Sequence, residues 1–151
     1  MILVGELRDP ESISIAMTAA ETGHLVLSTL HTLGASNTID RIVDGFSAEM
    51  QPQIRLQLSM VLRGVISQQL IRTNQGELHP AFEIMIANPA IKTMIRESKT
   101  HQIESAMQTY AGEGMVTMEA SLLKMYNDGL IDADAALAHS FNPDALKRRL
   151  R

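Results

Sequence analysis

Residues 1–6 read MILVGE, a short, largely β-branched apolar run that Gly5 closes and the carboxylate of Glu6 follows. Such a run predicts a strand over Ile2–Val4 that is buried on both faces, as strands of parallel sheets are. In open α/β sheets, ligands bind at the carboxyl ends of the strands. Glu6 is therefore a candidate functional group, and Gly5 would let the backbone pass close to a ligand. The alternative is an ordinary surface glutamate at a strand end.

The residues after this strand predict a helix and then a second strand. Asp9 is a typical N-cap, and Pro10 and Glu11 suit the first helical turn. Apolar residues then recur at helical spacing until Gly23 ends the helix. Residues 24–31 alternate in a way that predicts a strand. A strand, a helix and a strand in this order are typical of a parallel α/β sheet.

The middle of the chain predicts two helices and a hairpin. Apolar spacing indicates helices within residues 39–46 and 54–62. Residues 65–71 and 81–86 have the composition of strands, and the turn-rich segment Asn74–Gly76 lies between them. This order predicts an antiparallel pair joined by a turn.

The pattern becomes helical only in the last part of the chain. The pairs Asn88–Pro89 and Asn142–Pro143 repeat the signal of a capping residue followed by proline. We therefore expect a division near Ala87. It would separate an α/β part over residues 1–87 from an all-helical part over residues 88–151.

The composition limits the possible classes of protein. With 13 Lys and Arg against 17 Asp and Glu, the net charge is −4 at pH 7, which argues against a dedicated nucleic-acid-binding protein. The absence of cysteine excludes disulfide scaffolds and thiolate metal sites. No apolar run approaches the ~20 residues of a membrane span, and the first residues do not have the regions of a signal peptide. We therefore expect a soluble cytoplasmic protein with no membrane span.

The histidine pair His24 and His31 invites a metal-site interpretation that its spacing excludes. The two residues are seven positions apart. On an extended strand that offset spans roughly 23 Å and puts the side chains on opposite faces, and on a helix it spans about 10 Å. Zinc–nitrogen bonds of about 2.0–2.1 Å cannot bridge either distance. We therefore do not expect a metal-dependent hydrolase built on this pair. For His24, a residue at a helix-to-strand junction that bonds nearby carbonyls is the alternative.

Three segments together resemble the secretion-ATPase superfamily. VGELRD at residues 4–9 resembles its Walker B motif, and TAAETGH at residues 18–24 with STLHT at residues 28–32 resembles its His box. The resemblance covers nearly the whole chain and weakens after about Ile131. Further matching segments are residues 39–44, 65–70 and 83–86.

Within the superfamily, the chain is most similar to the PilT family of type IV pilus retraction ATPases. Pilus-extension and type II secretion ATPases usually carry a four-cysteine zinc module, and this chain has no cysteine. AIKTMIRE at residues 90–97 resembles a signature in the helical tail of retraction ATPases, although Lys92, Thr93 and Met94 depart from its commonest form. By this resemblance the interaction residues are Ala90, Ile91, Ile95, Arg96 and Glu97.

The resemblance implies a fold and a function. The fold class is α/β: the C-terminal part of a RecA-like P-loop ATPase core, with parallel strands plus a hairpin, followed by an all-helical tail. The cofactors are ATP and Mg²⁺, with no zinc and no haem. The full-length protein would be a homo-hexamer that couples ATP hydrolysis to pilus retraction and twitching motility. Its partners would be pilus-base and inner-membrane platform proteins, and it would be cytoplasmic, peripherally associated with the inner face of the cell membrane.

The resemblance also assigns roles to single residues. Glu6 would activate the attacking water or help to hold Mg²⁺, and His31 would sense the terminal phosphate. The residues expected near the nucleotide are Gly5, Arg8, Thr29 and His24. For Arg8, an ordinary ion pair is an equally good interpretation.

The sequence contains no G-x-x-x-x-G-K-[ST] motif, the P-loop that cradles phosphates. In the resembling family this loop lies N-terminal to the Walker B strand. We therefore expect the chain to correspond to the C-terminal portion of a motor ATPase, starting at Walker B. We also expect it to hydrolyse ATP negligibly by itself, because the P-loop carries most phosphate contacts. The alternative is a non-enzymatic interaction module that binds sibling subunits or pilus-base proteins.

Overall fold

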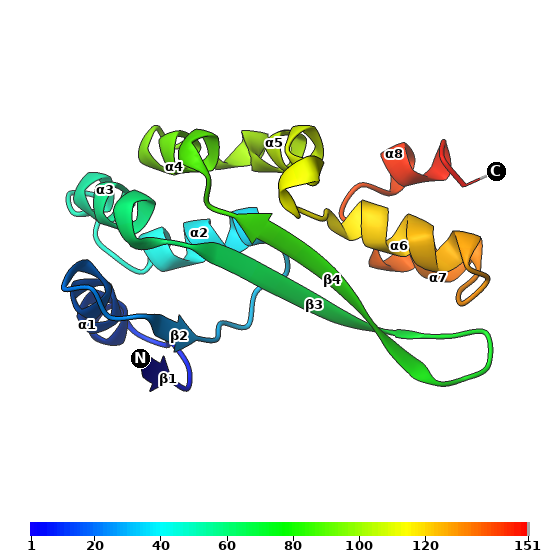
Figure 1. Ribbon diagram of the computed structural model, residues 1–151, viewed down its shortest axis with the longest axis horizontal. Coiled ribbons are helices and arrows are strands. Elements are labelled where there is room, and N and C mark those ends of the chain that lie inside the picture. Colours follow the sequence, from blue (N-terminus) through cyan, green and yellow to red (C-terminus); the bar gives the residue numbers. More distant parts are fainter. Residues whose placement is uncertain (151) are drawn as a thin grey trace.

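The computed structural model describes residues 1–150 and begins with the predicted strand–helix–strand unit (Figure 1). β1 (Ile2–Val4) pairs in parallel with β2 (Val26–Ser28), and α1 (Pro10–Glu21) connects the two strands. Because the pairing is parallel, the carboxyl ends of β1 and β2 meet at the same edge. The α/β prediction for this part of the chain is confirmed.

Two expectations for these strands are wrong. β2 is three residues long and does not span residues 24–31, because it pairs only with the three residues of β1. β1 is not buried on both faces, since Leu3 is 75% exposed and Ile2 is 36% exposed. Among the described residues β1 has a single neighbouring strand, so its side chains remain at the surface.

A long antiparallel hairpin runs through the molecule. β3 (Gly64–Arg72) and β4 (Leu78–Ile86) pair residue for residue along their whole length. The predicted turn between them is present, and Gly76 adopts a φ of 87° within it. Gly64 allows a close approach of the two strands, because a Cβ at that position would lie 2.8 Å from the carbonyl oxygen of Met85.

The remaining elements are helical, and the predicted helical tail is confirmed. The two helices predicted in the middle of the chain are also present, with earlier starts. In chain order the elements are α2 (Ala35–Asp44), α3 (Gln51–Val61), α4 (Pro89–Arg96), η1 (Thr100–Gln102), α5 (Ile103–Thr109), η2 (Ala111–Glu113), α6 (Met118–Asn127), α7 (Ala133–His139) and α8 (Pro143–Lys147). No helix within residues 1–150 is long and apolar enough to cross a lipid bilayer.

Buried apolar side chains form two clusters along the hairpin. The first packs α1 to α5 around one end of the hairpin and contains Ile39 and Ile91, both fully buried. The second packs α6 to α8 against the other end and contains Ile71 and Leu122. Figure 1 shows α4 to α8 along one side of the hairpin, with α1, β1 and β2 on the other. The first cluster draws residues from both sides of Ala87, and the predicted domain division there stays a prediction.

Candidate functional site

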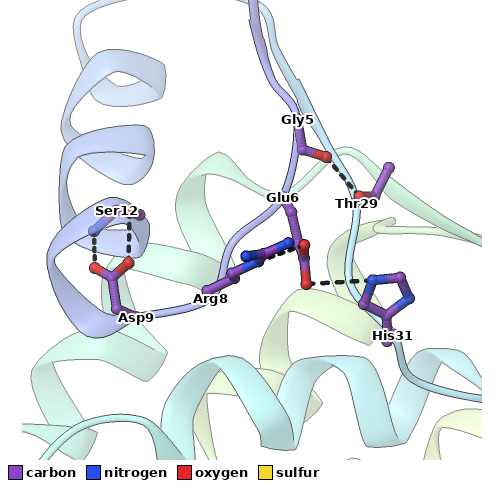
Figure 2. A network of polar contacts seen from close by, with 7 residues as sticks. All are labelled: Gly5, Glu6, Arg8, Asp9, Ser12, Thr29 and His31. Atoms are coloured by element: carbon purple, nitrogen blue, oxygen red, sulfur yellow. Dashed lines mark hydrogen bonds and ion pairs between the residues drawn. The ribbon is translucent and has the colours of Figure 1, made fainter.

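The candidate site lies where the chain leaves β1 and β2 (Figure 2). Beyond the last paired residues, Leu7 N donates a hydrogen bond to Thr29 O at 3.1 Å. The hydroxyl of Thr29 donates to Gly5 O at 2.6 Å. These two bonds continue the parallel pairing past the strands and fix the backbone on either side of Glu6. Thr29 therefore has a structural role here.

Glu6 lies between two cationic or potentially cationic groups. Its Oε1 is 3.2 Å from Nε2 of His31, and its Oε2 is 2.6 Å from Nε of Arg8. The Glu6 side chain is 23% exposed, whereas those of His31 and Arg8 are 83% and 78% exposed. A half-buried carboxylate is thus held by two groups that solvent or a ligand can reach. Of the predicted catalytic and nucleotide-side residues, the structure brings together Gly5, Glu6, Arg8, Thr29 and His31.

Asp9 is a helix cap, as predicted. Its Oδ1 accepts a hydrogen bond from Ser12 N at 2.8 Å, and its Oδ2 accepts one from the Ser12 hydroxyl at 2.9 Å (Figure 2). These bonds to Ser12 lower the pKa of the Asp9 carboxyl below its ordinary value. Both carboxylate oxygens are thus occupied by the start of α1.

His24 lies apart from this site. It precedes β2, whereas Glu6 and His31 follow the opposite, carboxyl ends of the strands. Its Nδ1 is 3.2 Å from Ala19 O and 3.2 Å from the hydroxyl of Thr22, both near the end of α1. This is the arrangement of a residue at a helix-to-strand junction that bonds a nearby carbonyl. Its nucleotide-side role stays a prediction that this geometry does not support.

The predicted interaction residues on α4 divide by burial. Ile91 and Ile95 are fully buried in the first core cluster, so the interaction role of their side chains stays a prediction that this burial does not support. The same cluster contains buried residues of α3 and α5. Ala90 is half-buried, and Arg96 and Glu97 are exposed. Any contact made through this helix therefore depends on its exposed residues.

Glu6 is the residue that the sequence predicted beside a divalent cation. Within residues 1–150, no group of three or more His, Asp or Glu side chains is arranged to hold a metal ion. Mg²⁺ is commonly bound by one or two carboxylates together with substrate phosphates and water. A lone carboxylate such as Glu6 fits that kind of site, in which phosphates and water supply the other ligands.

Two buried carboxylates did not stand out in the sequence. Glu83 is 4% exposed and Glu119 is 3% exposed. A signal for Glu83 exists, because it alternates in phase with Ala81 and Met85 on the buried face of β4. Its role depends on helices that are distant in sequence, and alternation alone does not reveal them.

Comparison with known proteins gives a consistent result. The family described as "Type II/IV secretion system protein" matches residues 1–135. The "Twitching motility protein" of Neisseria gonorrhoeae is 50% identical over 147 residues, covering 97% of this chain and 39% of the relative. The "Type IV pilus retractation ATPase PilT" of Pseudomonas aeruginosa is 51% identical over 136 residues, covering 90% of this chain and 40% of the relative.

The fold is also similar to that of a solved structure. The crystal structure of the pilus retraction motor PilT with bound ADP superposes with a TM-score of 0.87 at 44% sequence identity. The match covers 97% of this chain and 41% of that one. The chain thus spans about two fifths of the length of the relatives it matches.

Proposed function

This chain belongs to the family of type II/IV secretion system proteins, and from that premise we propose that it carries the Walker B and His box part of a motor ATPase. The motor would be a homo-hexamer that couples ATP hydrolysis to type IV pilus retraction and twitching motility. Residues 1–87 would contribute to the nucleotide-hydrolysing core and residues 88–151 would form the helical part. The names of two relatives with half of their aligned residues identical support this assignment.

The observation that carries the proposal is the contact between Glu6 and His31 at the carboxyl ends of two parallel strands. A carboxylate held at this edge can orient a water molecule and accept its proton. The imidazole of His31 is 83% exposed, so it can contact a terminal phosphate while its Nε2 remains beside Glu6. Arg8 holds the second carboxylate oxygen and fixes the orientation of the group. Mg²⁺ bound with the nucleotide would neutralise phosphate charge.

The cellular setting is part of the same proposal. The motor would act in the cytoplasm, peripherally associated with the inner face of the cell membrane. There it would contact pilus-base and inner-membrane platform proteins. Arg96 and Glu97, which are exposed at the end of α4, are the predicted interaction residues that such a partner could reach.

The first test is hydrolysis by the chain and by a chimera. Because the sequence contains no P-loop motif, we expect negligible phosphate release from residues 1–151 alone. In the chimera, this chain replaces the matching segment of the Pseudomonas aeruginosa PilT protein, which supplies the rest of the site. We expect ATP hydrolysis and restored twitching motility. Glu6→Gln should lower kcat by roughly 10²–10⁴-fold, the usual contribution of a general base.

Glu11→Gln is the matched control, because Glu11 is an exposed carboxylate in the first turn of α1. It should leave kcat unchanged. A chimera that assembles normally but retains its turnover with Glu6→Gln contradicts the proposed role of Glu6. Turnover by residues 1–151 alone that equals that of the chimera contradicts the dependence on a P-loop.

The absence of a P-loop motif favours one second candidate, a non-enzymatic module that binds sibling subunits or pilus-base proteins. The chimera separates the two functions. An interaction module would bind the sibling protein in a pull-down with purified components, while the folded chimera would release no phosphate.

A further inference from the structure

The loop that carries His31 ends at the start of α2, and a buried carboxylate of the hairpin binds the chain there. Glu83 lies on β4, and its Oε1 accepts a hydrogen bond from Ala35 N at 2.7 Å. Its Oε2 accepts one from Met118 N at 3.3 Å. Ala35 and Met118 begin α2 and α6, where backbone N–H groups have no partner within their own helix. One side chain therefore binds the first turns of two helices that are far apart in sequence.

Ser67 supplies a second bond at the same place. It lies directly opposite Glu83 in the hairpin, and its hydroxyl oxygen accepts a hydrogen bond from Gly34 N at 3.0 Å. Gly34 is the N-cap position of α2, and it has no side chain with which to cap the helix. Ser67 and Glu83 thus hold two consecutive amides, three and four residues after His31.

The C-terminal part of the chain packs against the same glycine. Gly34 has a φ of 87°, and a Cβ there would lie 3.2 Å from Cε2 of Phe141 and 3.6 Å from Oε1 of Glu83. The segment that carries Phe141 is itself fixed by Glu119. Oε1 of Glu119 accepts hydrogen bonds from Phe141 N at 2.9 Å and from Asn142 N at 3.1 Å.

The charge on Glu83 is costly in this position. Burial raises the pKa of the Glu83 carboxyl above its ordinary value, although the hydrogen bonds from Ala35 and Met118 oppose that rise. An apolar side chain of similar size would fill the same space without the free-energy cost of removing a charge from water. Its two acceptor oxygens, each used by a different helix, give it a role that an apolar residue cannot take.

From this arrangement we infer that Glu83, with Ser67, is a positioning residue that sets the place of the His31 loop and couples it to the C-terminal helices. Displacement of α6 relative to the hairpin moves the acceptor of Ala35 N, and a shift of the segment that carries Phe141 moves the contact on Gly34. The effect on catalysis rests on the proposed function, whereas the effect on the loop's structure does not.

The structural test uses residues 1–151 and needs no activity. Glutamine has one acceptor oxygen, so Glu83→Gln leaves Ala35 N or Met118 N without its acceptor. We expect amide hydrogen exchange at one or both positions to become faster by roughly tenfold. The imidazole carbon-bound proton signals of His31 should shift in the NMR spectrum. Glu77→Gln, an exposed change beside the hairpin turn, should alter neither readout.

The catalytic test uses the chimera. Glu83→Gln should lower kcat by roughly tenfold and leave KM within about twofold, because the loop and not the nucleotide contacts is disturbed. Ser67→Ala removes only the Gly34 bond, so it serves as a milder variant if Glu83→Gln fails to fold. Its Gly34 amide should exchange faster, and its His31 signals should shift.

Unchanged exchange at Gly34 and Ala35 in both variants overturns the inference. So does faster exchange with unaltered His31 signals and an unaltered kcat. An inactive chimera with no substitution contradicts the proposed function instead, and the exchange and His31 measurements then still decide the structural part.

Discussion

Glu104 is a partly buried carboxyl whose pKa is raised by burial and by neighbouring charges. Burial, and then the negative charges of Glu119 and Glu83, raise the pKa of its carboxyl above the ordinary 4.5. A carboxyl with a raised pKa binds protons more readily in the folded chain than in the unfolded one. Its contribution to stability is therefore complete below pH 4.5 and is lost as pH rises through the folded-state pKa.

Glu104→Gln tests this at the scale of one residue. Because the amide cannot ionise, the variant should have a higher Tm than the parent chain at pH 7, and the difference should shrink toward pH 4. Thermal unfolding followed by circular dichroism across this range measures the effect. Glu77→Gln is the control, because Glu77 is exposed, and its Tm difference from the parent chain should be small and should not shrink toward pH 4. A Tm difference for Glu104→Gln that is constant with pH contradicts the electrostatic explanation.

Single residues were predictable where the signal is local. Glu6 and His31 could be proposed as site residues because each follows a short apolar strand within a recognisable motif, and the structure brings the two side chains within 3.2 Å of each other beyond a parallel strand pair. Asp9 could be found because its partner, Ser12, is three residues away. Glu83 could not be assigned a role, because its partners Ala35 and Met118 belong to helices that only the tertiary fold places beside it.

At the scale of elements, helix starts with a local cap were predictable, and others were not. Asn88 and Asn142 cap α4 and α8 through hydrogen bonds from Ile91 N and Ala145 N, as the cap-then-proline pattern predicts. The start of α2 was placed too late by the apolar pattern. The N-cap position of α2 is Gly34, which has no side chain to cap the helix. Its first amides are instead bound by Ser67 of β3 and Glu83 of β4, which are distant in sequence.

The cap of α4 gives a prediction at this scale. Asn88 Oδ1 accepts a hydrogen bond from Ile91 N at 3.0 Å, so Asn88→Ala should lower the free energy of unfolding by about 1 kcal/mol. Urea unfolding measures it. Asn88→Ser is the matched control, because a serine hydroxyl can accept the same bond while losing the contact of Asn88 Nδ2 with Glu113. If the serine variant is destabilised as much as the alanine variant, the Glu113 contact and not the cap accounts for the loss.

At the scale of the whole molecule, the distribution of exposed apolar side chains has a consequence for association. β1 has one strand neighbour among the described residues and exposes Leu3, while the hairpin exposes Ile66, Leu70 and Leu78, each more than half exposed. Edges with unpaired backbone groups and clustered apolar side chains favour contacts between molecules. The sequence predicted a buried strand at β1, because hydrophobicity alone does not reveal how many neighbours a strand has.

We therefore expect residues 1–151 to self-associate, with a scattering mass that rises from micromolar to near-millimolar concentration. Leu3→Lys combined with Ile66→Lys should reduce that rise, because a charge on an exposed strand opposes pairing with a second copy. Leu56→Lys is the matched control, since Leu56 is 45% exposed but lies on the helix α3 and on neither strand pair. Multi-angle light scattering that finds a monomer at every concentration contradicts the expectation. If Leu56→Lys reduces association equally, the added positive charge and not the exposed strands accounts for the reduction.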